Sequence, residues 1–180
     1  MLSTLGEIPR FAARKFGERI ALVAGGREFS FRELDQLSDT LAYNLGKLGV
    51  APGDRVTLYG PNSWEWIVSY YGTLKTGAII NPINVMLTPP EVAYVTQNCG
   101  AKVLIGSPDK VGPARAAGVS NLTTIVFGPE AIQGTTPFDG LIAKPRKFEL
   151  AKVDPFATST IGYTSGTTGP PKVQYSRTER

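Results

Sequence analysis

Residues 163–172, with the sequence Tyr-Thr-Ser-Gly-Thr-Thr-Gly-Pro-Pro-Lys, combine the side chains best suited to chemistry in this chain. Four of them are serine or threonine, Thr164, Ser165, Thr167 and Thr168, whose hydroxyl groups can donate a proton, and two glycines let backbone N–H groups approach a ligand closely. The lysine adds a compact positive charge with several donors. Hydroxyl donors, open backbone and a cation together are typical of a phosphate-binding loop, and the stretch therefore predicts a site for the phosphates of ATP.

Two other interpretations of this stretch are less favoured. A Walker A loop would need Gly-Lys and then Ser or Thr where Pro171, Lys172 and Val173 stand. This mismatch argues against a kinase or an NTPase of the ordinary P-loop type. A flexible Gly/Ser/Thr linker rarely places prolines and a lysine directly after its hydroxyl cluster. The preceding run, residues 156–163, is apolar and β-prone and predicts a strand, so the loop is expected to leave a strand end.

The same stretch resembles the phosphate-loop signature of the adenylate-forming enzymes, which include acyl-CoA synthetases, peptide-synthetase adenylation domains and firefly-type luciferases. Thr167 favours the acyl-CoA synthetase branch, because the adenylation domains more often carry serine there. After Lys172 the family usually continues with glycine, valine and, a little later, histidine, whereas Val173 follows directly here. The residues that begin the next strand in the family are therefore missing. The resemblance implies that the β- and γ-phosphates of MgATP are held by Thr164, Ser165, Gly166, Thr167, Thr168, Gly169 and Lys172.

Weaker likenesses to the N-terminal region of acyl-CoA synthetases occur in family order at residues 60–63, 78–84, 88–91 and 100–105. The resemblance thus extends over most of the chain and implies the N-terminal fragment of such an enzyme. In the family, later residues contact adenine and ribose, bind magnesium, enclose the acyl group and supply a catalytic lysine. We therefore expect ATP and Mg²⁺ as cofactors, with most ligands of the ion outside this chain, and coenzyme A as a co-substrate.

The resemblance implies a ligase reaction in two steps. A carboxylic acid, most commonly a fatty acid, attacks the α-phosphate of ATP to give an acyl-adenylate, and the thiol of coenzyme A then displaces AMP. No catalytic residue and no metal ligand is predicted within this chain, so the fragment alone is expected to be inactive. The alternative is a non-catalytic module that binds a nucleotide or a partner chain. The residues do not identify the acid.

Composition limits the other classes of function. The chain has 180 residues, 42% of them hydrophobic, and its net charge of +4 is scattered rather than gathered into a nucleic-acid-binding stripe. Cys99 is the single cysteine and histidine is absent, which excludes an internal disulfide and a Cys-His or Ser-His pair and favours the cytoplasm. No apolar run approaches the ~20 residues of a membrane span. Glu7 and Glu18 favour a structural helix over a mitochondrial transit peptide near the N-terminus.

The order of elements predicts an α/β fold in which helices flank a mostly parallel sheet, as an incomplete N-terminal portion of a larger domain. Gly25 and Gly26 predict a small N-terminal β-hairpin between residues 20–24 and 27–30. We expect residues 1–153 to form the α/β portion, and residues 154–180 to add a strand and the truncated phosphate loop. Because the missing part would leave apolar surface uncovered, self-association through the exposed core is expected.

Capping patterns place the individual helices. Ser30 with Glu33, Ser63, and Thr88 with Glu91 predict helix starts, and Thr4 with Glu7 has the spacing of a capping box. The helices are expected at residues 5–16, 31–45, 64–75, 89–98, 113–117 and 138–143, and the strands at 55–59, 78–80, 102–105 and 123–127. Four aromatic residues are interpreted as core rather than as an acyl-binding wall: Trp64, Trp66, Tyr70 and Tyr71. Three acidic residues are interpreted as turn, helix-surface and cap residues rather than as acid/base groups: Asp54, Glu65 and Glu91.

Overall fold

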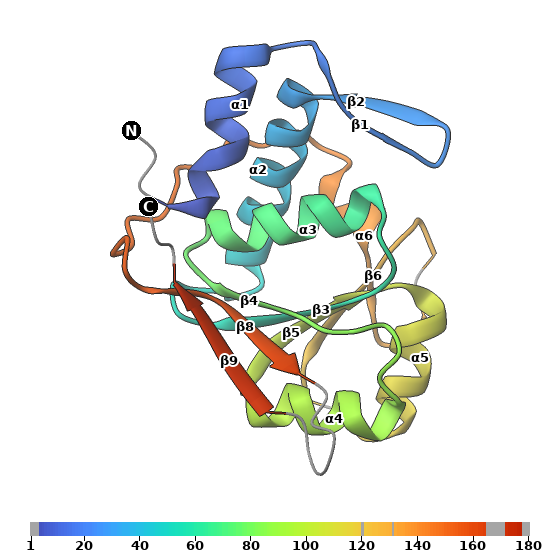
Figure 1. Ribbon diagram of the computed structural model, residues 1–180. Coiled ribbons are helices and arrows are strands. Elements are labelled where there is room, and N and C mark those ends of the chain that lie inside the picture. The colour runs from blue at the N-terminus through green and yellow to red at the C-terminus, as the bar shows by residue number, and fades with distance from the viewer. Residues whose placement is uncertain (1–3, 120, 131, 165–171, 178–180) are drawn as a thin grey trace.

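The computed structural model describes residues 4–119, 121–130, 132–164 and 172–177. Near the N-terminus, β1 (Ile20–Ala24) and β2 (Arg27–Ser30) form an antiparallel hairpin that projects from the body of the molecule (Figure 1). Its turn is made by Gly25 and Gly26, whose φ angles of 58° and 73° are easily reached only by glycine. The predicted hairpin is confirmed at both strands.

A seven-stranded sheet forms the centre of the molecule, in the order β7-β6-β5-β3-β4-β8-β9. Every neighbouring pair is parallel except β8 and β9, which confirms the mostly parallel sheet. The strands are β3 (Arg55–Tyr59), β4 (Ile79–Pro82), β5 (Ala101–Gly106), β6 (Thr123–Val126), β7 (Thr136–Pro137), β8 (Thr158–Thr164) and β9 (Lys172–Arg177).

Two details of the C-terminal strands differ from the sequence-based expectation. The strand before the phosphate loop begins at Thr158 rather than at Phe156, whose side chain is 68% exposed. Residues after the loop form β9 although they depart from the family pattern. The short β-prone run around Val173 and Tyr175 is sufficient for this, because β8 offers it an antiparallel partner.

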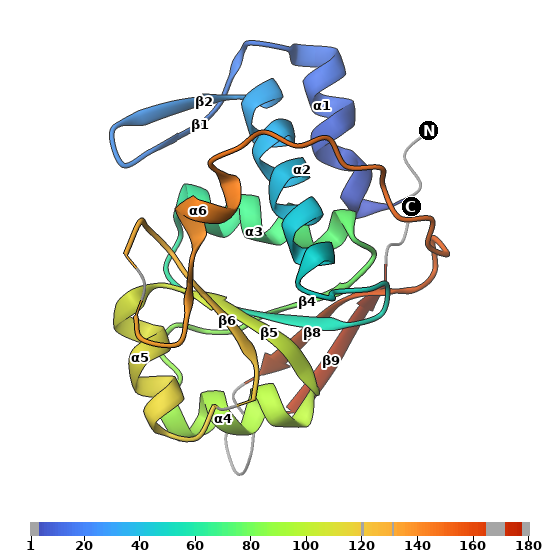
Figure 2. The same ribbon diagram turned by 180° about the vertical axis from the view of Figure 1, so that it is seen from behind.

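Helices cover both faces of the sheet (Figures 1 and 2). One face carries the short η1 (Leu5–Glu7) followed by α1 (Ile8–Phe16), α2 (Phe31–Lys47), α3 (Trp64–Lys75) and α6 (Phe138–Ile142). The other face carries α4 (Pro89–Asn98) and α5 (Pro108–Ala116). The apolar core is therefore divided into two layers, one on each side of the sheet.

Three helix starts, those of α2, α3 and α4, follow from local capping chemistry. The Ser30 hydroxyl accepts a bond from the N–H of Glu33 at 3.1 Å, and the Ser63 hydroxyl accepts one from the N–H of Trp66 at 3.2 Å. Thr88 begins α4 with the predicted capping box. Two expectations were wrong. The Thr4 hydroxyl donates to the Glu7 carboxylate instead of capping the helix, and α5 begins at Pro108, well before residue 113.

The aromatic residues of α3 belong to the core, as expected. Trp64 stacks on Phe29 of the hairpin with ring centroids 5.3 Å apart, and Trp66 stacks on Tyr70 at 5.4 Å. All four predicted aromatics are partly buried against the first core layer, Tyr71 included. The stacking of Trp64 on Phe29 joins α3 to the hairpin.

A buried ion cluster connects α1, α2 and α3. The Lys75 side chain is fully buried, and its Nζ donates to Asp35 Oδ1 at 2.5 Å and to Asp39 Oδ1 at 2.6 Å. Arg10 of α1 closes the cluster, because its Nη2 lies 2.7 Å from Asp39 Oδ2. Every charged group in this cluster has an opposite charge beside it, which is the condition for burying such groups without a large loss of stability.

Lys75→Met is expected to lower the free energy of unfolding by about 3–5 kcal/mol, because it leaves two carboxylates packed together with only Arg10 to balance them. The matched control is Arg32→Ala, which breaks an exposed ion pair with Glu18 and should cost less than about 1 kcal/mol. Urea-induced unfolding measures both values. Equal losses in the two variants would show that the buried cluster contributes no more than a surface pair.

Candidate phosphate-binding site

The strands β8 and β9 frame the predicted phosphate loop. Thr164, the last residue of β8, is the register partner of Lys172, the first residue of β9. Two of the seven predicted site residues thus have their backbones side by side at the point where the chain leaves and rejoins the sheet. The other five lie outside the described residues: Ser165, Gly166, Thr167, Thr168 and Gly169.

The position of β8 in the sheet places this frame at the edge where α/β proteins bind ligands. β8 runs parallel to β4, with Thr160 opposite Ile80, so Thr164 lies at the carboxyl edge of the parallel strands. In open α/β sheets, ligands bind outside the carboxyl ends of the strands. The fold therefore brings Thr164 and Lys172 to the edge at which a nucleotide site is expected.

Tyr163 holds the loop end of β8 against α4. Its hydroxyl donates to Asn98 Oδ1 at 2.7 Å, and its ring packs against the second core layer. Ile161, on the same face of the strand, is 6% exposed. In the sequence Tyr163 stands out only as the first residue of the signature. The alternation of Ile161 and Tyr163 was the available signal that this face of the strand is anchored.

A pocket of about 240 Å³ lies beneath β8 and is lined by Gly53, Arg55, Ile79, Asn98, Cys99, Ile161 and Tyr163. Arg55 is the one cation among the described residues that line this pocket, but its guanidinium already donates three hydrogen bonds. It donates to the carbonyl oxygens of Cys99 at 2.7 Å, Gly100 at 2.8 Å and Gly53 at 3.2 Å. Arg55 therefore joins the start of β3 to the turn before β5, and it is not offered to a phosphate.

Cys99 belongs to a small polar cluster in the same region. The Asn81 amide donates to Thr57 Oγ1 at 3.1 Å and to Cys99 Sγ at 3.3 Å. Burial raises the pKa of the Cys99 thiol, and the hydrogen bonds from Thr57 and Asn81 offset this only in part. A protonated, half-buried thiol is a poor nucleophile, so Cys99 serves as a packing residue.

The acidic residues considered in the sequence have structural partners. Burial acts to raise the pKa of Asp54, but Lys102 at 2.8 Å and the N–H of Ala51 outweigh it, so the pKa is lowered. The pKa of Glu91 is lowered by its hydrogen bonds from Thr88, which are those of the capping box. The turn and cap interpretations of Asp54 and Glu91 are confirmed, and Glu65 lies in the first turn of α3. In the part of the chain that the structure describes, no group of three His, Cys, Asp or Glu could hold a metal ion.

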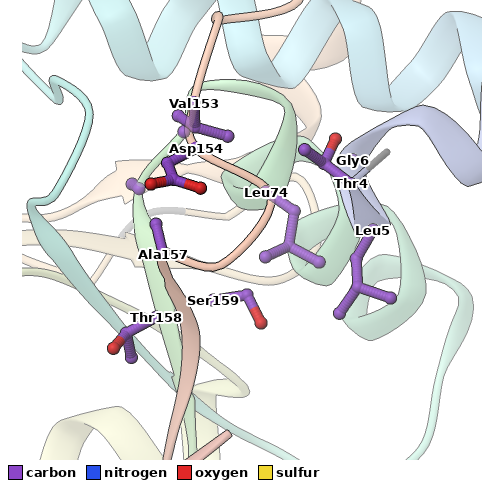
Figure 3. Close-up of a pocket in the computed structure, with 11 residues that line it drawn as sticks. Thr4, Leu5, Gly6, Leu74, Val153, Asp154, Ala157, Thr158 and Ser159 are labelled. Carbon is purple, nitrogen blue, oxygen red and sulfur yellow. The ribbon is translucent and has the colours of Figure 1, made fainter. Parts of the chain in front are cut away.

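A second, much smaller pocket lies near the start of β8, away from the loop end (Figure 3). It measures about 30 Å³ and lies between η1, the end of α3 and the segment that leads into β8. Figure 3 shows Leu5, Leu74 and Val153 around it, with Asp154 and Ser159 on the side of the strand. A cavity of this size has room for about one or two water molecules. A gap of this size is too small for ATP or an acyl group.

Comparison with protein-family models identifies the family of this chain. The family model described as "AMP-binding enzyme" matches residues 10–175, which is most of the chain. This chain belongs to the AMP-binding enzyme family. The match includes β8 and the first part of β9, the strands that frame the predicted phosphate loop, and it agrees with the resemblance carried by residues 163–172.

The curated relatives of this family member are ligases. A "3-[(3aS,4S,7aS)-7a-methyl-1,5-dioxo-octahydro-1H-inden-4-yl]propanoyl:CoA ligase" of Mycobacterium tuberculosis is 34% identical over 168 residues, covering 87% of this chain and 33% of the relative. "4-coumarate–CoA ligase 5" of Oryza sativa subsp. japonica is 33% identical over 91% of this chain and 30% of its own length. The chain thus spans about a third of the curated relatives that it matches.

Solved structures of AMP-binding enzymes have the same fold. The anthranilate CoA ligase AuaEII, solved in complex with anthranoyl-AMP, superposes with a TM-score of 0.92 at 28% identity, over 99% of this chain and 36% of AuaEII. The N-terminal domain of FACL13 from Mycobacterium tuberculosis gives a TM-score of 0.84 at 29% identity, over 99% of this chain and 45% of that domain. The helices and strands of this chain are therefore those of the N-terminal region of these ligases.

Cys99 is expected to react slowly with iodoacetamide at pH 8, because its raised pKa leaves little thiolate. The rate should be at least ~10-fold below that of the same chain unfolded in urea, where the thiol has its ordinary pKa of about 8.5. Since folding favours the protonated thiol, this contribution to stability is present below the ordinary pKa and is lost as the pH rises through the raised value. Equal alkylation rates in the folded and unfolded chain would contradict the burial of the thiol.

Proposed function

We propose that this chain is the N-terminal part of an ATP-dependent acyl-CoA synthetase. In this proposal residues 1–153 are the α/β scaffold, and residues 154–180 carry the loop that binds the ATP phosphates. The observation that carries the proposal is the pairing of Thr164 with Lys172 at the carboxyl edge of the sheet, in a member of the AMP-binding enzyme family. The signature residues between them supply hydroxyl and backbone donors of the kind that bind phosphate.

The proposed reaction has two steps. In the first, a carboxylate oxygen of the substrate attacks the α-phosphorus of ATP, the bond to the bridging oxygen of the β-phosphate breaks, and pyrophosphate leaves with the electron pair. In the second, the sulfur of coenzyme A attacks the acyl carbon and AMP leaves. The substrate acid provides the nucleophile of the first step, so the loop has to supply only position and charge.

Lys172 and the hydroxyl residues would act on the leaving pyrophosphate. Negative charge builds up on this group as the bond breaks, and donors fixed in advance stabilise that charge without reorganising. Magnesium would enter as the ion bound to ATP, where it neutralises phosphate charge. We assign it no ligand here, because the described residues contain no suitable cluster.

The acid is proposed only as a class. Relatives are named for a fatty acid, for 4-coumarate and for feruloyl-CoA, so their substrates differ widely in shape. A fatty acid is the first substrate to test, and a hydroxycinnamic acid is the second. Within the described residues, no helix is long and apolar enough to cross a membrane. The cytoplasm is the proposed location, because a chain with a single cysteine cannot form the internal disulfides that are typical of secreted proteins.

Lys172→Ala is expected to weaken MgATP binding to the chain about 10- to 100-fold, the loss of one charge-assisted hydrogen bond to a phosphate. Lys152→Ala is the matched control, because Lys152 is an exposed lysine that lies ahead of β8, away from the loop. Isothermal titration calorimetry with MgATP gives both affinities, and circular dichroism verifies that each variant is folded. Equal affinities for the two variants would remove the loop from the nucleotide site.

The isolated chain is expected to show no acid-dependent exchange between ATP and pyrophosphate, because the parts that enclose the acid lie outside it in the relatives. The assay uses the purified chain with radiolabelled pyrophosphate and a fatty acid, and Lys172→Ala as background. Exchange above that background would show that the chain has a complete adenylation site. Tight MgATP binding without exchange would leave two readings: the fragment of a synthetase, or a nucleotide-binding module in its own right.

A further inference from the structure

The segment that connects α6 to β8, residues 143–157, contains no helix and no strand. We call it the strap. Figure 2 shows it crossing the outer side of α2 and α1 before it turns down into β8. Loops longer than about 12 residues without secondary structure are uncommon, and those that occur are often functional. Ordering each residue costs about 1–2 kcal/mol of backbone entropy, so an ordered strap has to be held by specific contacts.

The helices hold the strap by its backbone. The Asn44 amide donates to the carbonyl oxygen of Leu141 at 2.6 Å, just before the strap. The Thr40 hydroxyl accepts the N–H of Arg146 at 3.0 Å. Further on, Arg10 Nη2 donates to the carbonyl oxygen of Phe148 at 2.8 Å. The anchors therefore follow one another along the strap in the direction of β8.

The side chains that make these contacts belong to α2 and α1. Thr40 and Asn44 are spaced i, i+4 and so share one face of α2. The Thr40 hydroxyl also donates to the carbonyl oxygen of Gln36 at 2.8 Å, which fixes its orientation, and only 1% of this residue is exposed. In contrast, Lys144 and Lys147 of the strap are exposed. Substitutions in the strap side chains should therefore matter less than substitutions in the helices that hold its backbone.

The last anchor joins the strap to the buried ion cluster. Arg10 binds Asp39 and the strap with the same Nη2, and the carbonyl oxygen of Lys75 accepts the N–H of Ala151 at 3.1 Å. A Cβ added to Gly77 would lie 2.7 Å from Val153 Cγ1, so the strap lies tightly on the turn between α3 and β4. The strap thus leads into β8 next to the beginning of β4, the parallel neighbour of β8.

We propose that Thr40, Asn44 and Arg10 are positioning residues for the nucleotide site, because through the strap they fix where β8 begins and in which register it pairs with β4. This inference rests on the function proposed above. A slip of one residue in β8 would move its loop end by about 3.3 Å and turn every side chain to the opposite face. Tyr163 would then leave α4, and Thr164 would leave its place beside Lys172.

The experiment compares Thr40→Val with Thr40→Ser in the full 180-residue chain. Valine keeps the shape but removes the acceptor for the Arg146 N–H, whereas serine keeps the acceptor. Hydrogen exchange followed by mass spectrometry should show amides of β8 exchanging about 10-fold faster in Thr40→Val, with β3 and β5 unchanged. Thr40→Ser, and the strap control Lys144→Ala, should behave like the unaltered chain. The affinity for MgATP should fall about 10-fold in Thr40→Val alone.

Each other outcome overturns part of the proposal. Faster exchange in β3, β5 and β8 alike would show a general loss of stability and no positioning role. Unchanged exchange in β8 would show that the strap does not hold the strand. Faster exchange in β8 with unchanged MgATP affinity would separate the strap from the nucleotide site. If the unaltered chain binds no MgATP, the proposed function fails for this chain, while the exchange pattern still decides the role of the strap.

Asn44→Ala is the second variant, in case the buried valine prevents folding. It removes the donor to Leu141 from a partly exposed position on α2. The same selective change in β8 is expected, and a variant that folds but protects β8 as well as the unaltered chain does would contradict the proposal. The two variants act at different points, Asn44→Ala at the end of α6 just before the strap and Thr40→Val within it, so an effect of both on the same strand would identify the strap as their common route.

Discussion

The burial of the Lys75 ammonium group is the constraint on which the helical layer depends. A charged group without solvent contact is strongly unfavourable unless opposite charges and hydrogen-bond acceptors surround it. Asp35 and Asp39 supply these from α2, and the carbonyl oxygen of Asp35 adds a third acceptor at 2.9 Å. Because α3 can bury Lys75 only where α2 presents both carboxylates, the cluster specifies how these two helices sit against each other.

The close contact of α2 and α3 agrees with this requirement. A Cβ added to Gly72 would lie 2.9 Å from the Leu41 side chain, so the helices approach as closely as a missing side chain allows. Arg10 then brings α1 into the same cluster through Asp39. Helix packing of this kind is usually set by apolar surfaces alone, and here the ion cluster adds a specific arrangement to it. Together α1, α2 and α3 cover the face of the sheet at β3, β4 and the start of β8.

Local features of the fold could be predicted from the sequence, because their causes lie within a few residues. Gly25 and Gly26 act on the turn they occupy, and Ser63 caps the helix that follows it directly. The anchors of β8 could not be predicted in the same way. Lys75 meets Asp35 and Asp39 across 40 and 36 residues, and Tyr163 meets Asn98 across 65. Neither contact leaves a local pattern, since a buried lysine and an exposed one look alike in a sequence.

The candidate site also has one feature with a local cause and one that depends on distant contacts. Phosphate binding is a prediction that residues 163–172 carry by themselves, because it needs particular groups close together in the chain. The location of the site in the sheet could not be predicted, because the sequence of a single strand does not determine which strands lie beside it. β4 and β8 are separated by three helices, three strands and the strap, and their pairing depends on contacts made far from the loop. The β8–β9 pairing brings the backbones of Thr164 and Lys172 together, and the β4–β8 pairing places them at the carboxyl edge of the parallel strands.

This division also bears on how a fold can persist while its sequence changes. The chain superposes on AuaEII with a TM-score of 0.92 although the two are only 28% identical. Contacts directed at the backbone suit such divergence, because every residue other than proline offers the same N–H and C=O groups whatever its side chain. The constraint then falls on the few side chains that reach those groups. A sheet edge can in this way keep its loop in place while most of the surrounding surface is free to vary.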